Sequence, residues 1–251
     1  MGAFEIIGGK KLKGEITPQG AKNEALQVLC AVLLTPEEVI IENIPNIVDI
    51  NILIELLQDL NVLVTKIDKN TYSFIAKDIN VDYLLSEKYK LKSSRIRGSI
   101  MILGPLLSRY GKGYIPKPGG DKIGRRRLDT HFIAFEKLGA NFNYDIKESF
   151  YHVTTEKLKG AYILLEEASV TGTANIVMTA VMAEGKTTIY NAACEPYLQQ
   201  LCKMLNSMGA KITGIGSNLL NIEGVTYLKG GKHKILPDMI EIGSFIGLAA
   251  I

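Results

Sequence analysis

Hydrophobic and polar positions along the chain repeat one order of helix and strand patterns three times. Each unit opens with a helix of small and apolar residues, continues with a strand and an amphipathic helix, and closes with two strands separated by turn residues. The opening helices are predicted at 20–34, 97–107 and 171–183, and the amphipathic helices at 48–60, 129–138 and 196–208. The strands are predicted at 39–43, 62–67 and 72–76, at 113–116, 142–146 and 150–154, and at 187–191, 211–215 and 219–222.

Units that bury their apolar faces against their neighbours are a common building plan, and these recur at roughly 70 to 80 residues. We therefore expect an α/β fold of three helix-strand-helix-strand-strand units, with the helices central and the sheets outside.

The two ends of the chain fall outside these three units. Strands are predicted at 4–7 and 12–17, and the run from Ile240 to Ile251 begins a fourth opening helix. A helix that ends with its apolar face uncovered is unusual in a folded domain. We therefore expect a fragment of a longer protein, with 21–236 as its first domain and with 1–20 and 237–251 as the strands and the stub of an incomplete second domain.

Composition and charge limit the kinds of molecule that this protein is expected to bind and the compartment in which it is expected to lie. The 251 residues carry 29 lysines and arginines against 26 aspartates and glutamates, a net charge of +3, whereas proteins that wrap nucleic acids usually have a clear basic excess. The N-terminus does not have the pattern of a secretory signal, and no apolar run reaches membrane-spanning length. Cys30, Cys194 and Cys202 are an odd number without zinc-ligand spacing, so we expect reduced thiols, no metal site and a cytoplasmic protein.

The segment 118–131, with the sequence PGGDKIGRRRLDTH, concentrates three glycines and four cations. Glycines keep a backbone adaptable, and arginine binds phosphate or carboxylate through a planar fork of donors. A mobile flap that closes over a multiply charged anion fits this combination. A solvated basic surface loop fits it equally well, because basic runs are common.

Candidate anion ligands also stand at three predicted helix starts. Lys22 and Asn23 begin the first opening helix, where free backbone N–H groups and the helix dipole favour an anion. Arg95 and Arg97 lie two apart near the second, so only one of them is expected to face a site. Ser169 lies at the start of the third, where it would also serve as a simple helix cap. If these helix starts meet in one region, a phosphate-bearing substrate is the expected ligand; solvated surface side chains are the alternative.

Six motifs together resemble one enzyme family. They are GAKNEAL at 20–26, RGSIMILGPLL at 97–107, PGGDKIGRRRLDTH at 118–131, LGA at 138–140, NAACEP at 191–196 and LPDMIEIGSF at 236–245. Over its whole length the chain resembles the UDP-N-acetylglucosamine 1-carboxyvinyltransferase family of enolpyruvyl transferases. The resemblance implies an inside-out α/β barrel fold with six units in two domains, of which this chain holds the first three units.

The resemblance also implies a reaction. Members of this family transfer the enolpyruvyl group of phosphoenolpyruvate to the 3′-hydroxyl of UDP-N-acetylglucosamine and release phosphate, through a tetrahedral intermediate and without a metal or another cofactor. This reaction is the first committed step of peptidoglycan synthesis, and so serves cell wall biogenesis, cell shape and cell division. Both expected partners are small molecules, so neither a nucleic acid nor a membrane is expected.

Particular residues take their expected roles from the same resemblance. Lys22 and Asn23 are expected to contact phosphoenolpyruvate, and Arg97 and Arg126 are expected to contact the anionic substrates. Lys22 and Asp121 are the expected catalytic residues. The residues expected to line the UDP-sugar site are Arg126, Arg127, Leu128, Asp129, Thr130, Glu167, Ala168, Ser169 and Val170.

Three positions depart from the family pattern. Asp121 replaces the cysteine that the family uses as a proton donor, while Glu167 and Arg127 replace a common lysine and a common proline. An ordinary aspartate, with a pKa of about 3.9, is almost fully ionised at neutral pH. We therefore expect Asp121 to act as the acid only in a closed state in which burial raises its pKa. We also expect fosfomycin, which alkylates a thiolate, to leave it unmodified.

The resemblance places the general base and further phosphoenolpyruvate-binding arginines of the family beyond residue 251, so we expect this chain alone to be inactive. A non-catalytic UDP-sugar-binding module is the alternative interpretation. A nucleic-acid binder that uses Arg125–Arg127 is disfavoured by the near-neutral charge and by the lack of aromatic residues interleaved with that run.

Overall fold

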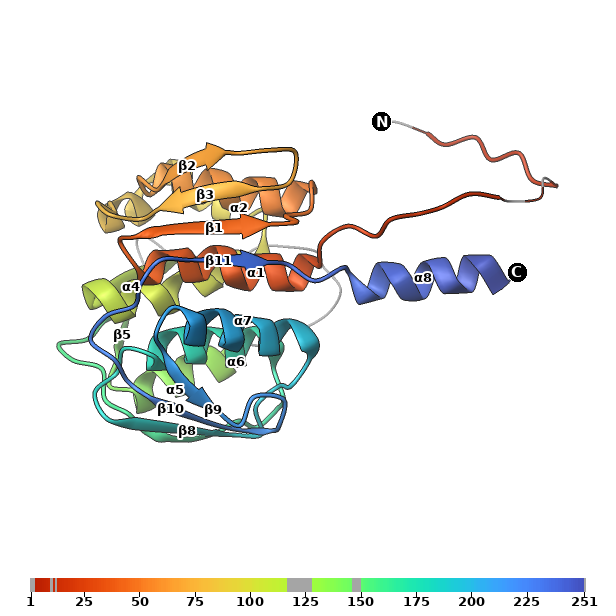
Figure 1. Ribbon diagram of the computed structural model, residues 1–251. Coiled ribbons are helices and arrows are strands. Elements are labelled where there is room, and N and C mark those ends of the chain that lie inside the picture. The colour runs from red at the N-terminus through yellow and green to blue at the C-terminus, as the bar shows by residue number, and fades with distance from the viewer. Residues whose placement is uncertain (1–2, 10, 12, 117–127, 146–149, 251) are drawn as a thin grey trace.

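The computed structural model describes residues 3–9, 11, 13–116, 128–145 and 150–250 (Figure 1). The three predicted units are present. The first contains α1 (Lys22–Ala31), β1 (Glu38–Glu42), α2 (Val48–Asp59), β2 (Leu63–Lys66) and β3 (Tyr72–Ile75). The second contains α4 (Leu103–Tyr110), β4 (Lys112–Pro116), α5 (Asp129–Lys137), β5 (Asn141–Asp145) and β6 (Phe150–Thr154). The third contains α6 (Val170–Ala180), β8 (Lys186–Tyr190), α7 (Pro196–Ser207), β9 (Lys211–Thr213) and β10 (Leu219–Glu223).

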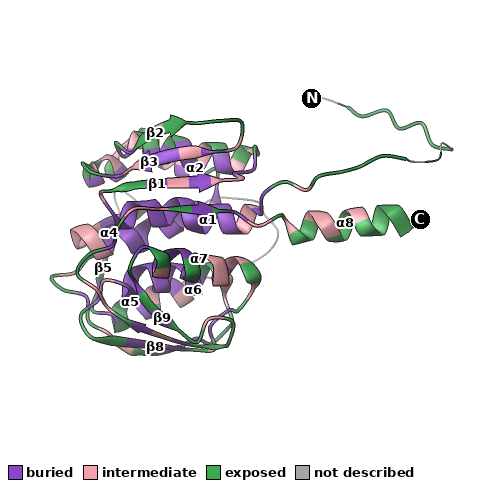
Figure 2. Cartoon of the chain, viewed as in Figure 1, coloured by how far each residue is buried: buried purple, intermediate pink, exposed green. Residues whose placement is uncertain are grey.

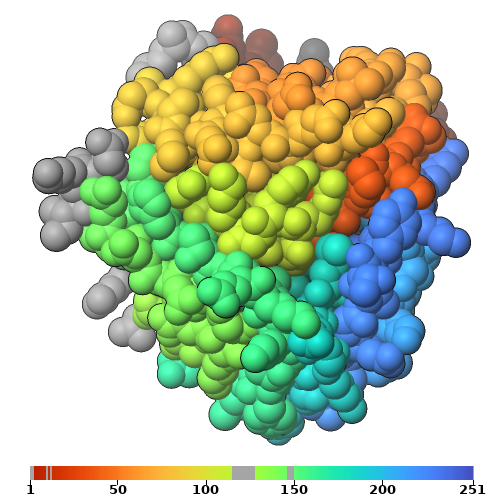
Figure 3. Space-filling model, turned by 90° about the vertical axis from the view of Figure 1, so that its left-hand side faces the viewer, coloured from red at the N-terminus to blue at the C-terminus, as the bar shows by residue number. Residues whose placement is uncertain are grey.

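Each unit forms a sheet from its own three strands, and two of the sheets gain a parallel strand from the preceding unit. Strand β7 (Tyr162–Leu164) follows the second unit and pairs with β8. Strand β11 (Gly231–Lys234) follows the third unit and pairs with β1 of the first, so that the units close into a ring. Figure 3 shows the first unit in orange and yellow on one side of the molecule, with the second and third below it in green and blue.

The second sheet, β4-β6-β5, has three strands among the described residues. The segment after β3 forms the 3₁₀ helix η2 (Val81–Leu85) and α3 (Glu87–Ser93) in place of a further strand. Helix η2 lies against β4, and Lys112 Nζ contacts Asp82 Oδ1 at 2.7 Å. At the junction of the first and second units, the edge strand β4 is therefore covered by η2 and is not paired with a described strand of the first sheet.

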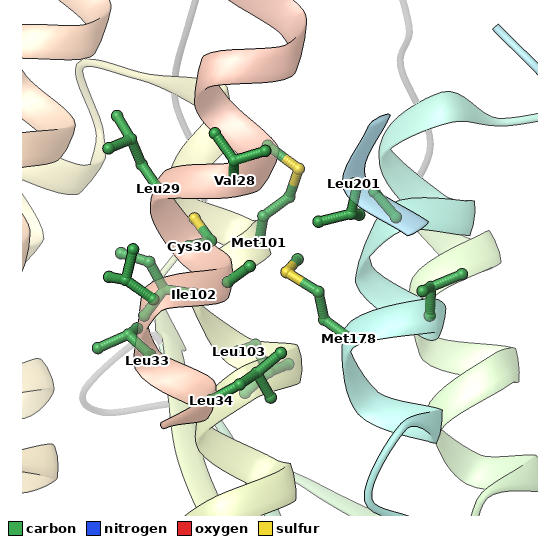
Figure 4. Packing of buried hydrophobic residues seen from close by; sticks show 14 of the residues in the cluster. Val28, Leu29, Cys30, Leu33, Leu34, Met101, Ile102, Leu103, Met178 and Leu201 are labelled. Atoms are coloured by element: carbon green, nitrogen blue, oxygen red, sulfur yellow. The ribbon is translucent and has the colours of Figure 1, made fainter. Parts of the chain in front are cut away.

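The core lies between the inner helices α1, α4 and α6, and the sheets lie outside it, as the repeat pattern predicts (Figure 2). A helix that is apolar on all sides is a buried helix, and α1 is buried continuously from Glu24 to Ala31. Figure 4 shows Val28, Met101, Met178 and Leu201 converging from different helices. In β1 the alternation is typical of a sheet with one buried face, because Val39 and Ile41 point inward.

The helix predicted at 97–107 begins as the 3₁₀ helix η3 (Arg97–Ile102) and becomes α-helical only at Leu103. Pro105 has no backbone N–H and cannot donate to the carbonyl four residues before it, which disfavours a regular α-helical turn at this point. At the end of η3 the Leu103 N–H instead donates to the Ile100 carbonyl, three residues before it. The short elements α3, β7 and β11 are absent from the sequence-based prediction.

The strands predicted at 4–7 and 12–17, as part of an incomplete second domain, do not form among the described residues of this chain. Residues 4–7 and 13–17 have no strand pairing, and Phe4 and Ile6 are 99% and 90% exposed. A strand needs a neighbouring strand to receive its backbone hydrogen bonds, and the segment extends away from the body of the protein (Figure 1). Helix α8 (Met239–Ala250), predicted from residue 240, is present and has no buried residue.

Candidate functional site

Lys22 is the first residue of α1, and its two nitrogen atoms contact two different carboxylates. Its backbone N–H donates to Asp238 Oδ2 at 3.2 Å, and its ammonium Nζ lies 2.5 Å from Asp49 Oδ2 on α2. The Lys22 side chain is 45% exposed. No side chain at the N-cap residue caps the helix. The Lys22 ammonium is therefore accessible to solvent and paired with Asp49, so an anion would compete with Asp49 for it. The next residue, Asn23, has a half-buried side chain.

Arg97 and Arg95 occupy different environments. Arg95 is exposed, whereas Arg97 is half-buried at the first position of η3. The next residue, Gly98, lies directly against α1, because a Cβ at this position would be 2.9 Å from Leu26 Cδ2. The close approach that this glycine permits brings Arg97 to the same end of the fold as the first turns of α1.

The start of α5 meets the start of α6. Leu128 is half-buried and precedes α5, Asp129 is exposed at its first position, and Thr130 is half-buried. The methyl carbon Cγ2 of Thr130 would be 2.9 Å from a Cβ at Gly172. Ser169 caps α6, since its Oγ accepts a hydrogen bond from the Gly172 N–H at 3.2 Å. The helix-cap interpretation of Ser169 is thereby confirmed, and it does not depend on a ligand.

Asn175 and His131 form a buried polar pair next to these helix starts. Asn175 on α6 donates from Nδ2 to the Ile100 carbonyl at 3.0 Å, and its Oδ1 accepts the Gly104 N–H at 3.0 Å. The same Nδ2 lies 3.1 Å from Nδ1 of His131 on α5. An amide nitrogen only donates, so Nδ1 of His131 is the acceptor and its proton is on Nε2. Asn175 thus joins the second inner helix, α5 and α6 at one point.

His131 is neutral at physiological pH. Burial and, to a lesser extent, the positive charge of Arg97 together lower its pKa to about 4. The neighbouring charge also shows that Arg97 lies close to His131 in space. Contacts connect α1 to η3, η3 to α6, and α6 to α5, and they bring Lys22, Arg97, Thr130 and Ser169 to one end of the domain.

A cavity of 420 Å³ opens beside Thr130. It is lined by the outer face of α5, including Thr130 and Lys137, and by β7 and the following Glu166. Its walls are mostly aliphatic, with one cation and one carboxylate. The predicted residues Glu167 and Ala168 are exposed directly after Glu166, and Ser169 and Val170 are half-buried as they enter α6.

Asp121, Arg126 and Arg127 lie outside the described residues, as does the rest of the segment 117–127. Sequence reasoning did not single out Asp49, His131 or Asn175 as site residues. A detectable signal existed for Asn175, which is an amide residue in the middle of a helix of apolar and small residues and threonines. Asp49 carried no signal beyond its place in the first turn of a helix.

All three cysteines are free, as predicted, with Cys30 and Cys202 buried and Cys194 exposed. Burial raises the pKa of both buried thiols, that of Cys202 to about 12. Within the described ranges, no group of three or more His, Cys, Asp and Glu side chains could hold a metal ion. None of the described helices is long and apolar enough to cross a membrane.

Comparison with known proteins gives consistent results. The sequence profile of EPSP synthase (3-phosphoshikimate 1-carboxyvinyltransferase) matches residues 6–251. A relative from Bacteroides thetaiotaomicron, named UDP-N-acetylglucosamine 1-carboxyvinyltransferase, is 61% identical over the whole of this chain. A relative of the same name from Treponema denticola is 47% identical over the whole of this chain. The chain spans 58% and 57% of the lengths of these two relatives.

Solved structures share the fold at low sequence identity. The enolpyruvyl transferase NikO from Streptomyces tendae superimposes with a TM-score of 0.80 at 19% identity, over 95% of this chain and 55% of that one. EPSP synthase from Acinetobacter baumannii superimposes with a TM-score of 0.72 at 17% identity, over 95% of this chain and 53% of that one. At these identities the likeness concerns the fold alone.

Proposed function

The chain belongs to the EPSP synthase family of enolpyruvyl transferases, and from this membership we propose that it is part of a UDP-N-acetylglucosamine 1-carboxyvinyltransferase. The observation that carries the proposal is the 61% identity to a relative of that name, sustained over all 251 residues. The proposed reaction transfers enolpyruvyl from phosphoenolpyruvate to the sugar 3′-hydroxyl in the cytoplasm. It would supply peptidoglycan synthesis, and through it cell shape and division.

The start of α1 is the proposed site for the phosphate of phosphoenolpyruvate. Lys22 supplies a cation there, Asn23 supplies an amide, and the helix dipole adds a partial positive charge. The support is the 45% exposure of the Lys22 side chain. A bound phosphate would compete with Asp49 for the Lys22 ammonium, and Arg97 would contribute a second cation from η3.

The starts of α5 and α6 are the proposed site for the UDP-sugar, with Leu128, Asp129 and Thr130 on one side and 167–170 on the other. The support is the packing of Thr130 against Gly172 and the 420 Å³ cavity beside Thr130 and Glu166. Glu167 and Glu166 make this side of the site acidic. The negative charge of the diphosphate is therefore assigned to Arg126 and Arg127 rather than to residues after β7.

In the proposed reaction the sugar hydroxyl loses its proton to a base and its oxygen bonds to the phosphate-bearing carbon of phosphoenolpyruvate. An acid protonates the terminal methylene carbon, which gives a tetrahedral intermediate. The bond to phosphate then breaks, a proton leaves the methyl group, and the vinyl ether remains. Asp121 is the proposed acid, and Lys22 is proposed to stabilise the negative charge of the departing phosphate.

Titration calorimetry together with phosphate release tests this proposal. UDP-N-acetylglucosamine and phosphoenolpyruvate are titrated into this chain and into a version extended to the full length of the relatives, and phosphate is measured in both. We expect turnover only in the extended protein, because this chain spans 58% of a relative's length. Binding of UDP-N-acetylglucosamine without turnover in either protein would support the binding-module alternative. Absence of both binding and turnover in the extended protein would refute the proposal.

A further inference from the structure

Glu24 and His233 form a buried side-chain pair between the first turn of α1 and β11. Glu24 is fully buried and His233 is 9% exposed. Glu24 Oε1 lies 2.8 Å from His233 Nε2, and the residues are 209 positions apart in the sequence. The second oxygen, Oε2, accepts the Leu236 N–H at 3.2 Å. A carboxylate only accepts hydrogen bonds, so His233 Nε2 is the donor.

The pair lies where two distant segments of the chain cross. Residues 19–22 and 236–238 run antiparallel, with hydrogen bonds from the Ala21 N–H to the Leu236 carbonyl and from the Asp238 N–H to the Gln19 carbonyl, both at 2.8 Å. Asp238 also accepts the backbone N–H of Lys22. Helix α8 begins directly after this crossing.

We propose that Glu24 and His233 are a positioning pair that locks this crossing and thereby sets the start of α1, with Lys22 and Asn23, relative to α8. Both Glu24 oxygens bind the segment that follows from β11, at His233 and at the Leu236 N–H, while the Glu24 backbone belongs to the first turn of α1. His233 adds the closing strand of the ring to the same contact. The part of this inference that concerns substrate rests on the proposed function.

Burial makes the pair a strong constraint. A carboxylate in the core is tolerated only when its oxygens are hydrogen-bonded, and removal of one partner leaves the other desolvated and unpaired. Two residues before Glu24, the Lys22 ammonium is accessible and shared with Asp49. A shift of the first turn would move this ammonium and the neighbouring backbone N–H groups together.

Amide hydrogen exchange on this chain without ligand tests the lock directly. We expect Glu24→Leu and His233→Leu to accelerate exchange in peptides covering 19–26 and 233–241 by about tenfold relative to the third sheet, β8-β10-β9. His233→Gln retains an N–H donor and is expected to recover most of the protection. Gln27→Leu is the matched control, because Gln27 lies one turn further along α1 and its buried amide has no hydrogen-bond partner among the described residues.

Substrate titration separates positioning from general stability. We expect the Glu24→Leu and His233→Leu variants to bind phosphoenolpyruvate about tenfold more weakly. The affinity for UDP-N-acetylglucosamine should be unchanged, because none of its proposed residues belongs to α1, β11 or the crossing. Unchanged exchange at the crossing in folded Glu24→Leu, or equal acceleration in the third sheet, would overturn the lock. If wild type binds neither substrate while exchange responds as expected, the proposed function fails and the lock stands.

Discussion

Arg95 and Arg97 are separated by a single residue, yet only Arg97 is half-buried. We expect Arg97→Ala to weaken the binding of anionic substrate about thirtyfold, because a charge-assisted hydrogen bond contributes about 2 kcal/mol. Arg95→Ala is the matched control and should change affinity less than twofold. Calorimetric titration of both variants checks this, and equal losses at the two positions would place the anion outside this site.

Asp121 leads to a prediction about covalent inhibition. A carboxylate is a much poorer nucleophile towards an epoxide than a thiolate is, so fosfomycin should not inactivate the extended protein in a time-dependent manner. Asp121→Cys should restore inactivation, with one adduct per chain. Intact-mass spectrometry after incubation with fosfomycin measures both, and an adduct on Asp121 in the wild-type protein would contradict the expectation.

The lowered pKa of His131 predicts that the free energy of unfolding depends on pH. Its pKa is about 4 in the folded protein and about 6.5 in an unfolded chain, so the unfolded state binds more protons between these values. Stability contributed by neutral His131 is therefore complete above pH 6.5 and is lost as the pH falls to 4, by about 3 kcal/mol. Urea unfolding at pH 7 and pH 4.5 should show a smaller pH dependence in His131→Gln than in wild type.

His152 provides the control for this measurement. It lies half-buried on β6, and His152→Gln should preserve the wild-type pH dependence. If His131→Gln and His152→Gln have the same slope of unfolding free energy against pH, the acid sensitivity originates elsewhere in the protein.

Arg109 connects several elements at the end of the inner helices. It lies in the last turn of α4, and its Nη1 donates to the carbonyl oxygens of Leu33 and Ala76, each at 2.8 Å. Its guanidinium also lies 5.1 Å from the centre of the Tyr110 ring. One side chain thus joins the end of α4, the 3₁₀ helix η1 (Val32–Leu34) that follows α1, and the residue after β3.

Arg109→Met should lower the free energy of unfolding by about 2 to 3 kcal/mol, because two buried carbonyl groups lose a charged donor. Lys112→Met is the control, since Lys112 pairs with an exposed carboxylate on Asp82 and should cost less than about 1 kcal/mol. Urea denaturation measures both. Equal effects would mean that the Arg109 contacts add nothing beyond an ordinary surface charge.

At the scale of the whole molecule, the pairing of β11 with β1 closes the ring of three units, and the two ends of the chain contribute little to its packing. Strand β11 returns the chain to β1, whereas α8 has no buried residue and the described residues of 3–17 are exposed. A chain of residues 18–238 should therefore unfold cooperatively, with a free energy within about 1 kcal/mol of the 251-residue chain. It should also associate less, because exposed apolar surface promotes association. Urea unfolding and sedimentation velocity test the two expectations.

Most elements of the fold could be predicted from the sequence because their signals are local. The apolar spacing in 48–60 and 196–208 and the alternation in 150–154 depend on neighbours within a few positions, and α2, α7 and β6 form there. At 4–7 and 13–17 the same kind of local signal does not produce a strand in this chain, because a strand pattern specifies no partner. Strands β7 and β11 show the converse, since they become strands through parallel pairing with β8 and β1.

The residues of the candidate site fall into the same two groups, those with a local signal in the sequence and those without one. Its charged and capping residues, such as Lys22, Arg97 and Ser169, could be recognised in the sequence by their type and their place at helix starts. Their partners could not, because Asp49, His131 and Asn175 reach them only through the packing of separate helices. The Glu24–His233 contact spans 209 positions and exists only because β11 closes the ring. Local propensity acts over a few residues, whereas these pairings require the whole chain to be folded.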